Sequence, residues 1–327
     1  MIYLIMIIGF ILFNILIRIK SVNNIINNIT NILSMPLNII NKYIKISLLE
    51  ITLFILIITL ILIIILKIKK KIKFNFKKIF IFIYTILILY ILFHGINYYR
   101  NNIYEELNFK ELEIEETKYN DLIDNYIKKI NELIDIKQNE DLFKLSDKEL
   151  LKYGNNGYDN LNLQNLNNYE VTSKPLLLSS IYIYTGITGM YFPIYKEVNI
   201  NMKTYKYSLP FTISHEIAHA RGIAKEDEAN FYAFISSINS NYFEYQFSGY
   251  YQILKYLINT KEQYNKLPKL IKQLYQEENN YYKKYEGIID DISSFINNLF
   301  LKSQNQSGIS SYNNVSKIIY SYYYKEE

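Results

Sequence analysis

The chain has 327 residues and half of them (50%) are hydrophobic, yet the mean hydropathy is only -0.03, so a strongly apolar part must be balanced by a strongly polar part. The cysteine count is 0, which excludes a disulfide framework and any cysteine metal site, so a metal ion would have to be held by His, Asp or Glu. The net charge of +5 is concentrated in one short lysine-rich stretch, and it predicts no nucleic-acid partner.

Three apolar runs occupy the N-terminal part of the chain, at residues 1–17, 51–66 and 79–93. Each is near the short end of a membrane-spanning helix, which needs about 17–25 residues, and flanking lysines can extend the effective length. The alternative for each run is a buried core helix. The first run could also be a cleaved signal peptide, but it lacks the basic start that signal peptides have. The sequence therefore predicts a membrane anchor of three transmembrane helices over residues 1–100, with the lipid bilayer as a partner.

Seven lysines lie between the second and third apolar runs, within residues 67–78, whereas the longer first loop holds fewer basic residues. Basic loops stay in the cytoplasm, so the third helix is expected to run outward. Residues 101–327 then form an extracytoplasmic domain attached to the cytoplasmic membrane. If the third run did not span the bilayer, this domain would lie on the opposite side.

Periodic apolar residues between 104 and 151, such as Leu122, Tyr126, Ile130 and Leu133, predict an amphipathic helix. Residues 154–169 are rich in Asn and Gly and are expected to form a loop. Residues 176–184 are expected to be helical, 190–195 and 197–201 to be short strands, and the remainder of the chain to be helical. The predicted fold class is mostly α (α+β), with a small sheet in the domain that follows the membrane anchor.

The sequence His215-Glu216-Ile217-Ala218-His219 lies on a predicted helix of about thirteen residues that starts near Ser208 and Pro210 and ends before Gly222. At about 100° per residue, His215 and His219 lie within roughly 40° of each other, so both imidazoles can reach one metal ion. Glu216 points about 100° away from His215, where it can hold a water on that ion rather than bind the ion. This pattern predicts a Zn²⁺ site with Glu216 as general base.

A third protein ligand is needed, and the only other histidine, His94, ends the third apolar run, where an interfacial polar residue is expected. The acidic run Glu226-Asp227-Glu228 is the nearest source. If the site helix continued straight, Glu226 would lie about 10 Å beyond His219, so Gly222 must end that helix and allow a second one to fold back.

On the second helix Ala229 and Ala233 share a side with Glu226 and Asn230. Small residues permit close helix packing, which would turn Glu226 toward the metal, with Asn230 one turn further on to orient it. Glu228 is the alternative third ligand and Asp227 ranks behind it. For all three acids, capping of the helix N-terminus is the competing interpretation.

These residues resemble a family of bacterial membrane proteins catalogued as domain of unknown function 3810, grouped with zincin-type peptidases. The resemblance is carried by Gly95–Arg100, Lys174-Pro175, Gly189–Pro193, Leu209–Gly222, Glu226–Asn230, Phe300–Ser303 and Gly308–Tyr312. It implies a zinc-dependent, membrane-bound peptidase, and the Glu-x-x-x-Asn arrangement implies that Glu226 is the third ligand. By the same resemblance residues 190–201 would bind a substrate backbone by strand addition, with an ordinary hairpin as the alternative.

Three further residues have open roles at this point. Arg221 and Tyr312 are candidate donors to the oxyanion of a tetrahedral intermediate. Glu197 follows Ile194-Tyr195-Lys196, where smaller residues would be expected from the family, so no role is assigned to it.

The sequence thus predicts a membrane-bound zinc metallopeptidase with a zincin-like domain that hydrolyses peptide or protein substrates. Two alternatives belong to other classes. The first is a non-catalytic envelope or scaffold protein whose structural metal is closed by a fourth protein ligand. The second is a zinc amidase that acts on cell-wall material.

Overall fold

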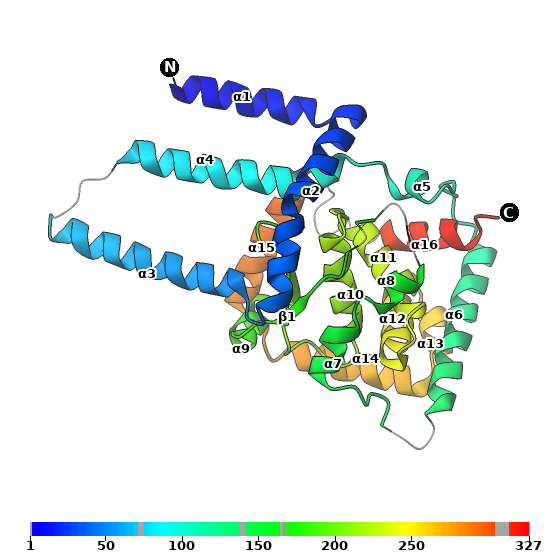
Figure 1. Cartoon of the computed structure of the whole chain (residues 1–327). Helices are drawn as coiled ribbons and strands as arrows, with labels where there is room; N and C mark the ends of the chain where they lie inside the picture. Colours follow the sequence, from blue (N-terminus) through cyan, green and yellow to red (C-terminus); the bar gives the residue numbers. More distant parts are fainter. Residues whose placement is uncertain are drawn as a thin grey trace. The chain divides into compact units, whose positions relative to one another are not determined.

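The computed structural model describes residues 2–70, 75–137, 141–161, 163, 166–167, 169–304 and 314–326, and it is mostly helical with one small sheet (Figure 1). The chain divides into two compact units. The first unit contains residues 1–100 and 192–197, and the second contains residues 101–191 and 198–327.

The first unit consists mainly of helices. They are α1 (Ile2–Leu16), α2 (Lys20–Tyr43), α3 (Leu48–Ile68), α4 (Phe76–Phe93) and the 3₁₀ helix η1 (Gly95–Tyr99). Among the described residues, α3 and α4 are each long and apolar enough to cross a membrane. Helix α1 has only 15 residues and forms a pair with α2 that is bent by 107°, so three spans result only if this pair counts as one.

Helix α2 was expected to be part of a loop, and this expectation was wrong. Its many asparagines have weak helix propensity, but tertiary contacts hold the helix in place. Its polar side faces inward: the Asn23 side-chain amide donates to the carbonyl oxygens of Ile17 (3.0 Å) and Ile96 (2.8 Å). Most of its isoleucines, for example Ile25 and Ile32, are exposed.

The turn at residues 192–197 also belongs to the first unit. The Glu197 carboxylate is fully buried and accepts hydrogen bonds from the backbone N–H groups of Leu48 (3.0 Å) and Leu49 (3.4 Å). Within α3 these first N–H groups have no carbonyl partner, and a negative charge at this end also complements the helix dipole. Beside them the Tyr195 hydroxyl hydrogen-bonds with Thr52 at 2.8 Å. Glu197, which had no assigned role, therefore caps α3.

The second unit begins with helices and three short strands. They are α5 (Ile103–Glu106), α6 (Glu116–Ile136), α7 (Asp147–Tyr153), α8 (Asn156–Leu161), β1 (Ser173–Pro175), α9 (Ser179–Tyr182), η2 (Ile183–Thr185), β2 (Gly189–Phe192) and β3 (Glu197–Ile200). The ends Phe192 and Glu197 of the last two strands are counted in the first unit.

Helices make up the rest of the second unit. They are α10 (Leu209–Ala220), α11 (Glu226–Ile238), α12 (Phe243–Leu257), α13 (Lys261–Lys266), α14 (Lys269–Tyr282), α15 (Ile288–Ser303) and α16 (Val315–Tyr323). The predicted amphipathic helix is confirmed as α6, whose Leu122, Ile123 and Ile130 are fully buried in a core shared with α11 and α12.

The sheet has the strand order β1-β3-β2, so β3 is central. Strand β3 confirms the strand predicted at 197–201, and β2 confirms the first half of the strand predicted at 190–195, the rest of which is a turn. Strand β1 pairs in parallel with β3 through Lys174↔Asn199 and was not predicted. Its proline is tolerated because β1 is an edge strand. The helix expected at residues 176–184 is shorter than predicted and consists of α9 and η2.

The loop expected at residues 154–169 contains helix α8, so this expectation was wrong in part. Gly157 explains the close approach of α8 to α11, since a Cβ atom added there would lie 1.8 Å from the backbone oxygen of Ser236. The glycines that suggested a loop instead permit close helix packing.

We expect Gly157→Ala to destabilise the second unit, because the added methyl group must push two helices apart. Overpacking of this kind lowers the free energy of unfolding by about 1–3 kcal/mol, and each kcal/mol lowers the melting temperature by roughly 2–4 °C. Thermal unfolding of the detergent-solubilised chain, followed by circular dichroism, measures it. Gly287→Ala is the control, because no atom lies within 4 Å of its added Cβ; equal melting temperatures for the two variants would contradict the prediction.

Candidate metal centre

Helix α10 begins with Pro210 in its first turn, as its sequence predicts, and it is buried along most of its length. Ile213, Ile217 and Ala218 have no exposed surface and anchor the helix in the core. This packing fixes the position of the two histidines on α10.

The helix ends at a tight turn that depends on glycine. Gly222 has a φ of 99°, which side-chain-bearing residues rarely adopt. The N–H of Gly222 donates to the carbonyl of His219 (3.0 Å) and the N–H of Ile223 donates to the carbonyl of Ala218 (3.1 Å), which is the Schellman arrangement. The predicted break of the site helix at Gly222 is therefore confirmed.

Helix α11 starts at Glu226 and packs directly against α10. Its Ala229 and Ala233 are fully buried, and their small side chains allow the two helices to approach closely. The first turn of α11 thereby lies beside the histidines of α10.

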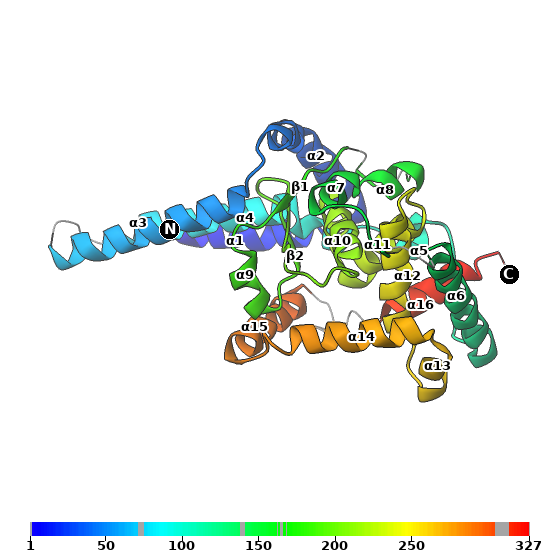
Figure 2. The same ribbon diagram turned by 90° about the horizontal axis from the view of Figure 1, so that it is seen from below.

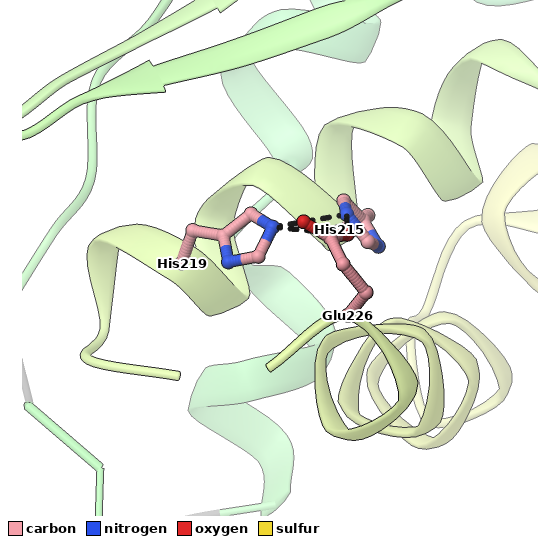
Figure 3. A group of neighbouring side chains, drawn as sticks. All are labelled: His215, His219 and Glu226. Atoms are coloured by element: carbon pink, nitrogen blue, oxygen red, sulfur yellow. Dashed lines mark hydrogen bonds and ion pairs between the residues drawn. The ribbon is translucent and has the colours of Figure 1, made fainter. Parts of the chain in front are cut away.

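His215 and His219 point from α10 toward Glu226 on α11 (Figure 3). The His215 Nε2 and His219 Nε2 atoms are 3.1 Å apart, and the Oε2 atom of Glu226 lies 3.2 Å from the first and 3.6 Å from the second. These three residues form the one His/Cys/Asp/Glu group among the described residues whose donor atoms could share a metal ion.

The spacing of these donors fits a small divalent ion. Zinc binds imidazole nitrogen and carboxylate oxygen at about 2.1 Å, and donors at the corners of a tetrahedron of that size lie about 3.4 Å apart. The three separations, 3.1, 3.2 and 3.6 Å, bracket this value. Two imidazoles and one carboxylate are also a donor set that zinc commonly accepts.

The orientation of the His219 ring is fixed by a hydrogen bond on its far side. Its Nδ1–H donates to the carbonyl oxygen of Ile223 at 2.7 Å, so Nε2 is the ring nitrogen that faces Glu226 and could bind a metal. Burial lowers the pKa of His219, but the carboxylates of Glu226 and Glu216 outweigh this effect and raise the pKa to about 9. Burial also opposes the charge on Glu226, yet the two imidazoles hold the pKa of Glu226 well below its usual range.

Glu216 lies beside the donor group without belonging to it, as predicted from its position on the helix. Burial raises the pKa of Glu216, while the nearby imidazoles and a hydrogen bond from the backbone of Tyr191 act in the opposite direction. Strand β2 therefore contacts this carboxylate. A Cβ atom at Gly189 would lie 2.6 Å from the Glu216 Cγ atom and 2.8 Å from its Oε1 atom, so only glycine leaves room for the side chain.

Glu228 and Asp227 lie outside the group. Glu228 forms an ion pair with Lys225 at 2.8 Å, and burial raises its pKa. The Asp227 carboxylate lies in the first turn of α11, where its charge complements the helix dipole, and it accepts the backbone N–H of Glu228 at 2.9 Å.

Of the two candidate oxyanion donors, Arg221 and Tyr312, the structure describes only Arg221. The Arg221 guanidinium donates to Asn155 Oδ1 (3.0 Å) and lies over the ring of Tyr158 (4.9 Å), so it fastens α8 to the end of α10. Tyr312 is outside the described residues. His94 is in the first unit, where its ring lies between those of Tyr90 and Tyr98.

Sequence reasoning missed three features of the site. They are the steric role of Gly189, the backbone hydrogen bond of Tyr191 and the proximity of Tyr256 on α12. Burial raises the pKa of Tyr256 to about 12, the charge of Glu226 acts in the same direction, and Asn230 forms a side-chain hydrogen bond with it. Gly189 was a visible signal, because a glycine inside a strand often marks a close approach.

Over the residues that the structure describes, the fold and the site define a mostly helical protein with two or three helices apolar enough to cross a membrane and one candidate metal centre. Comparison with known families gives a match over residues 23–320 to the family described as protein of unknown function (DUF3810). The chain belongs to this family. Searches of curated proteins and of solved structures gave no match.

We expect Glu226→Gln to lower the affinity of the chain for Zn²⁺ by at least about 100-fold, since loss of a direct ligand should exceed the 10–100-fold effect of outer-shell partners. Glu228→Gln is the matched control, two residues away, and should leave the affinity unchanged. Competition with a chromophoric chelator measures both. Weak binding by Glu228→Gln together with normal binding by Glu226→Gln would assign the third ligand to Glu228.

Proposed function

We propose that this protein is a membrane-bound, zinc-dependent metallopeptidase that hydrolyses peptide bonds. His215, His219 and Glu226 hold Zn²⁺, and Glu216 is the general base. The observation that carries the proposal is the convergence of three donor atoms beside a buried carboxylate that is not one of them.

The number of ligands favours a catalytic site over a structural one. Structural zinc sites are closed by four protein ligands, whereas catalytic sites have three and keep one position for water or substrate. Among the described residues the donor group has three members. This supports an enzyme rather than the scaffold protein with a closed structural metal.

When bound, zinc supplies Lewis acidity, which makes water easier to deprotonate and a substrate carbonyl more electrophilic. The Glu216 carboxylate takes the proton of the attacking water as the new C–O bond forms. It then returns that proton to the amide nitrogen as the C–N bond breaks. The raised pKa of Glu216 suits a group that must both accept and return a proton.

Strand β2 is the candidate for substrate binding within residues 190–201. It is an edge strand of the sheet and contacts Glu216, so a peptide added to this edge would lie along the general base. A zincin-like domain, in which an edge strand and an HExxH helix flank the metal, is consistent with this arrangement.

The proposed location is the cytoplasmic membrane, with residues 101–327 on its outer side. The argument rests on the lysines between α3 and α4, the two helices that are individually long enough to span. It holds whether or not α1 and α2 form a further span, because only α4 leads into the second unit.

We expect Glu216→Gln to retain Zn²⁺ but to lose hydrolysis by about 100-fold or more, the typical contribution of general-base catalysis. The full chain in detergent is assayed for zinc content and for turnover of a fluorogenic peptide library. Full activity in this variant would remove the mechanism. Zinc binding without turnover by the unaltered chain would favour the scaffold protein, and turnover of cell-wall amides alone would favour the amidase.

We also expect Gly189→Ala to lower kcat/KM by roughly 100-fold while the zinc content stays unchanged, because the added methyl group displaces Glu216 without touching a metal ligand. Gly287→Ala, which adds the same methyl group in open space, should retain full activity. Loss of zinc from Gly189→Ala, or unaltered turnover, would show that β2 does not position the general base.

A further inference from the structure

Helix α15 is amphipathic, but its apolar side faces outward. Seven of its eight large apolar residues, at positions 288, 289, 292, 295, 296, 299 and 300, are exposed, with Ile288 at 77% and Phe295 at 63%, and the eighth, Leu301, is buried. On the opposite side Asp290 and Ser293 are half-buried, whereas Ser294 and Asn297 are exposed. In a helix at the surface of a soluble domain the apolar stripe faces the core, so this orientation is the reverse of the usual one.

The exposed apolar surface extends beyond α15 to α9 and η2. Figures 1 and 2 show α9 beside α15 in both views, and η2 packs directly against α15. Leu177, Leu178 and Ile181 at α9 are also exposed, each by half or more of its surface. We call the exposed apolar residues of α9 and α15 the apolar patch. Large contiguous apolar patches on a protein surface mark sites of contact with another protein or with a membrane.

Tyrosine and lysine side chains border the apolar patch. Tyr184 of η2 lies against Tyr285 with ring centroids 5.1 Å apart, and Lys283 and Lys284 next to it are exposed. Tyrosine and lysine are the residues that concentrate where hydrocarbon meets lipid headgroups, since each has an apolar body and a polar tip.

The chain itself provides the partner that fits this surface. Helices α3 and α4 are apolar enough to enter a membrane, and the three residues 100–102 that join η1 to α5 span at most about 11 Å. A bilayer that α3 and α4 enter is therefore within reach of the second unit. Helix α2 in the first unit has the same reversed polarity, with polar residues buried and isoleucines exposed.

We propose that the apolar patch of α9 and α15 inserts into the interface of the lipid bilayer, so that the second unit lies on the membrane surface rather than free in water. In α15 the acidic Asp290 and Asp291 outnumber the basic Lys302, so we expect insertion to depend on apolar burial and to require only zwitterionic lipid. The proposal does not depend on the metal centre or on hydrolysis.

The absence of tryptophan from the sequence (Trp 0) allows a direct test. The full chain carrying Phe295→Trp is reconstituted into phosphatidylcholine vesicles with and without brominated acyl chains, which quench only fluorophores within the bilayer. Ile136→Trp, at the end of α6 and 71% exposed, is the matched control outside the apolar patch. Brominated lipid should roughly halve the emission of Phe295→Trp, because interfacial helices insert about 5–10 Å, and should leave that of Ile136→Trp unchanged.

Iodide in solution gives the complementary measurement, with strong quenching of Ile136→Trp and weak quenching of Phe295→Trp. Strong iodide quenching of Phe295→Trp without any effect of brominated lipid would overturn the proposal. Protection of Phe295→Trp from both quenchers, lost when the protein-to-lipid ratio is lowered, would also overturn it, because the apolar patch would then be covered by a second copy of the chain.

Discussion

The candidate metal centre depends on the close packing of α11 against α10. The turn at Gly222 reverses the chain within a few residues, and Ala229 and Ala233 let the second helix approach the first. A larger side chain at either alanine would separate the helices, and a residue that cannot adopt a positive φ would change the angle at which α11 leaves the turn. Either change would move the Glu226 carboxylate away from the two imidazoles. The imidazoles themselves would stay together, because both extend from α10.

The strand that contacts Glu216 links the site to the first unit through the chain itself. Strand β2 begins at Gly189, against the Glu216 carboxylate, and continues into the turn at residues 192–197, which belongs to the first unit. There the buried Glu197 carboxylate caps α3, one of the helices apolar enough to cross a membrane. The segment that contacts Glu216 therefore continues directly along the chain into the unit that contains α3.

Helices α2 and α15 show where sequence reasoning fails. Both have a helical apolar periodicity, and the usual inference would bury the apolar side. In this protein Asn23 and Thr30 of α2 are buried, while most isoleucines of α2 and those of α15 are exposed. Apolar periodicity shows that a helix has an apolar and a polar face. Which face turns inward depends on whether water or lipid surrounds the helix. The polar side of α2 could be buried because Asn23 finds carbonyl oxygens to bind, and no local pattern predicts those partners.

By itself the sequence determined the site helix, its end at Gly222, the return of a second helix and the facing of His215 and His219, because these follow from helical geometry and from the backbone freedom of glycine. It left Glu226 and Glu228 both open as the third ligand. Only the tertiary structure distinguished their positions. The two side chains point in different directions from α11, and the packing of α11 against α10 decides which of them faces the histidines. The same holds for Gly189 and Glu197, whose roles arise from contacts with segments distant in the chain.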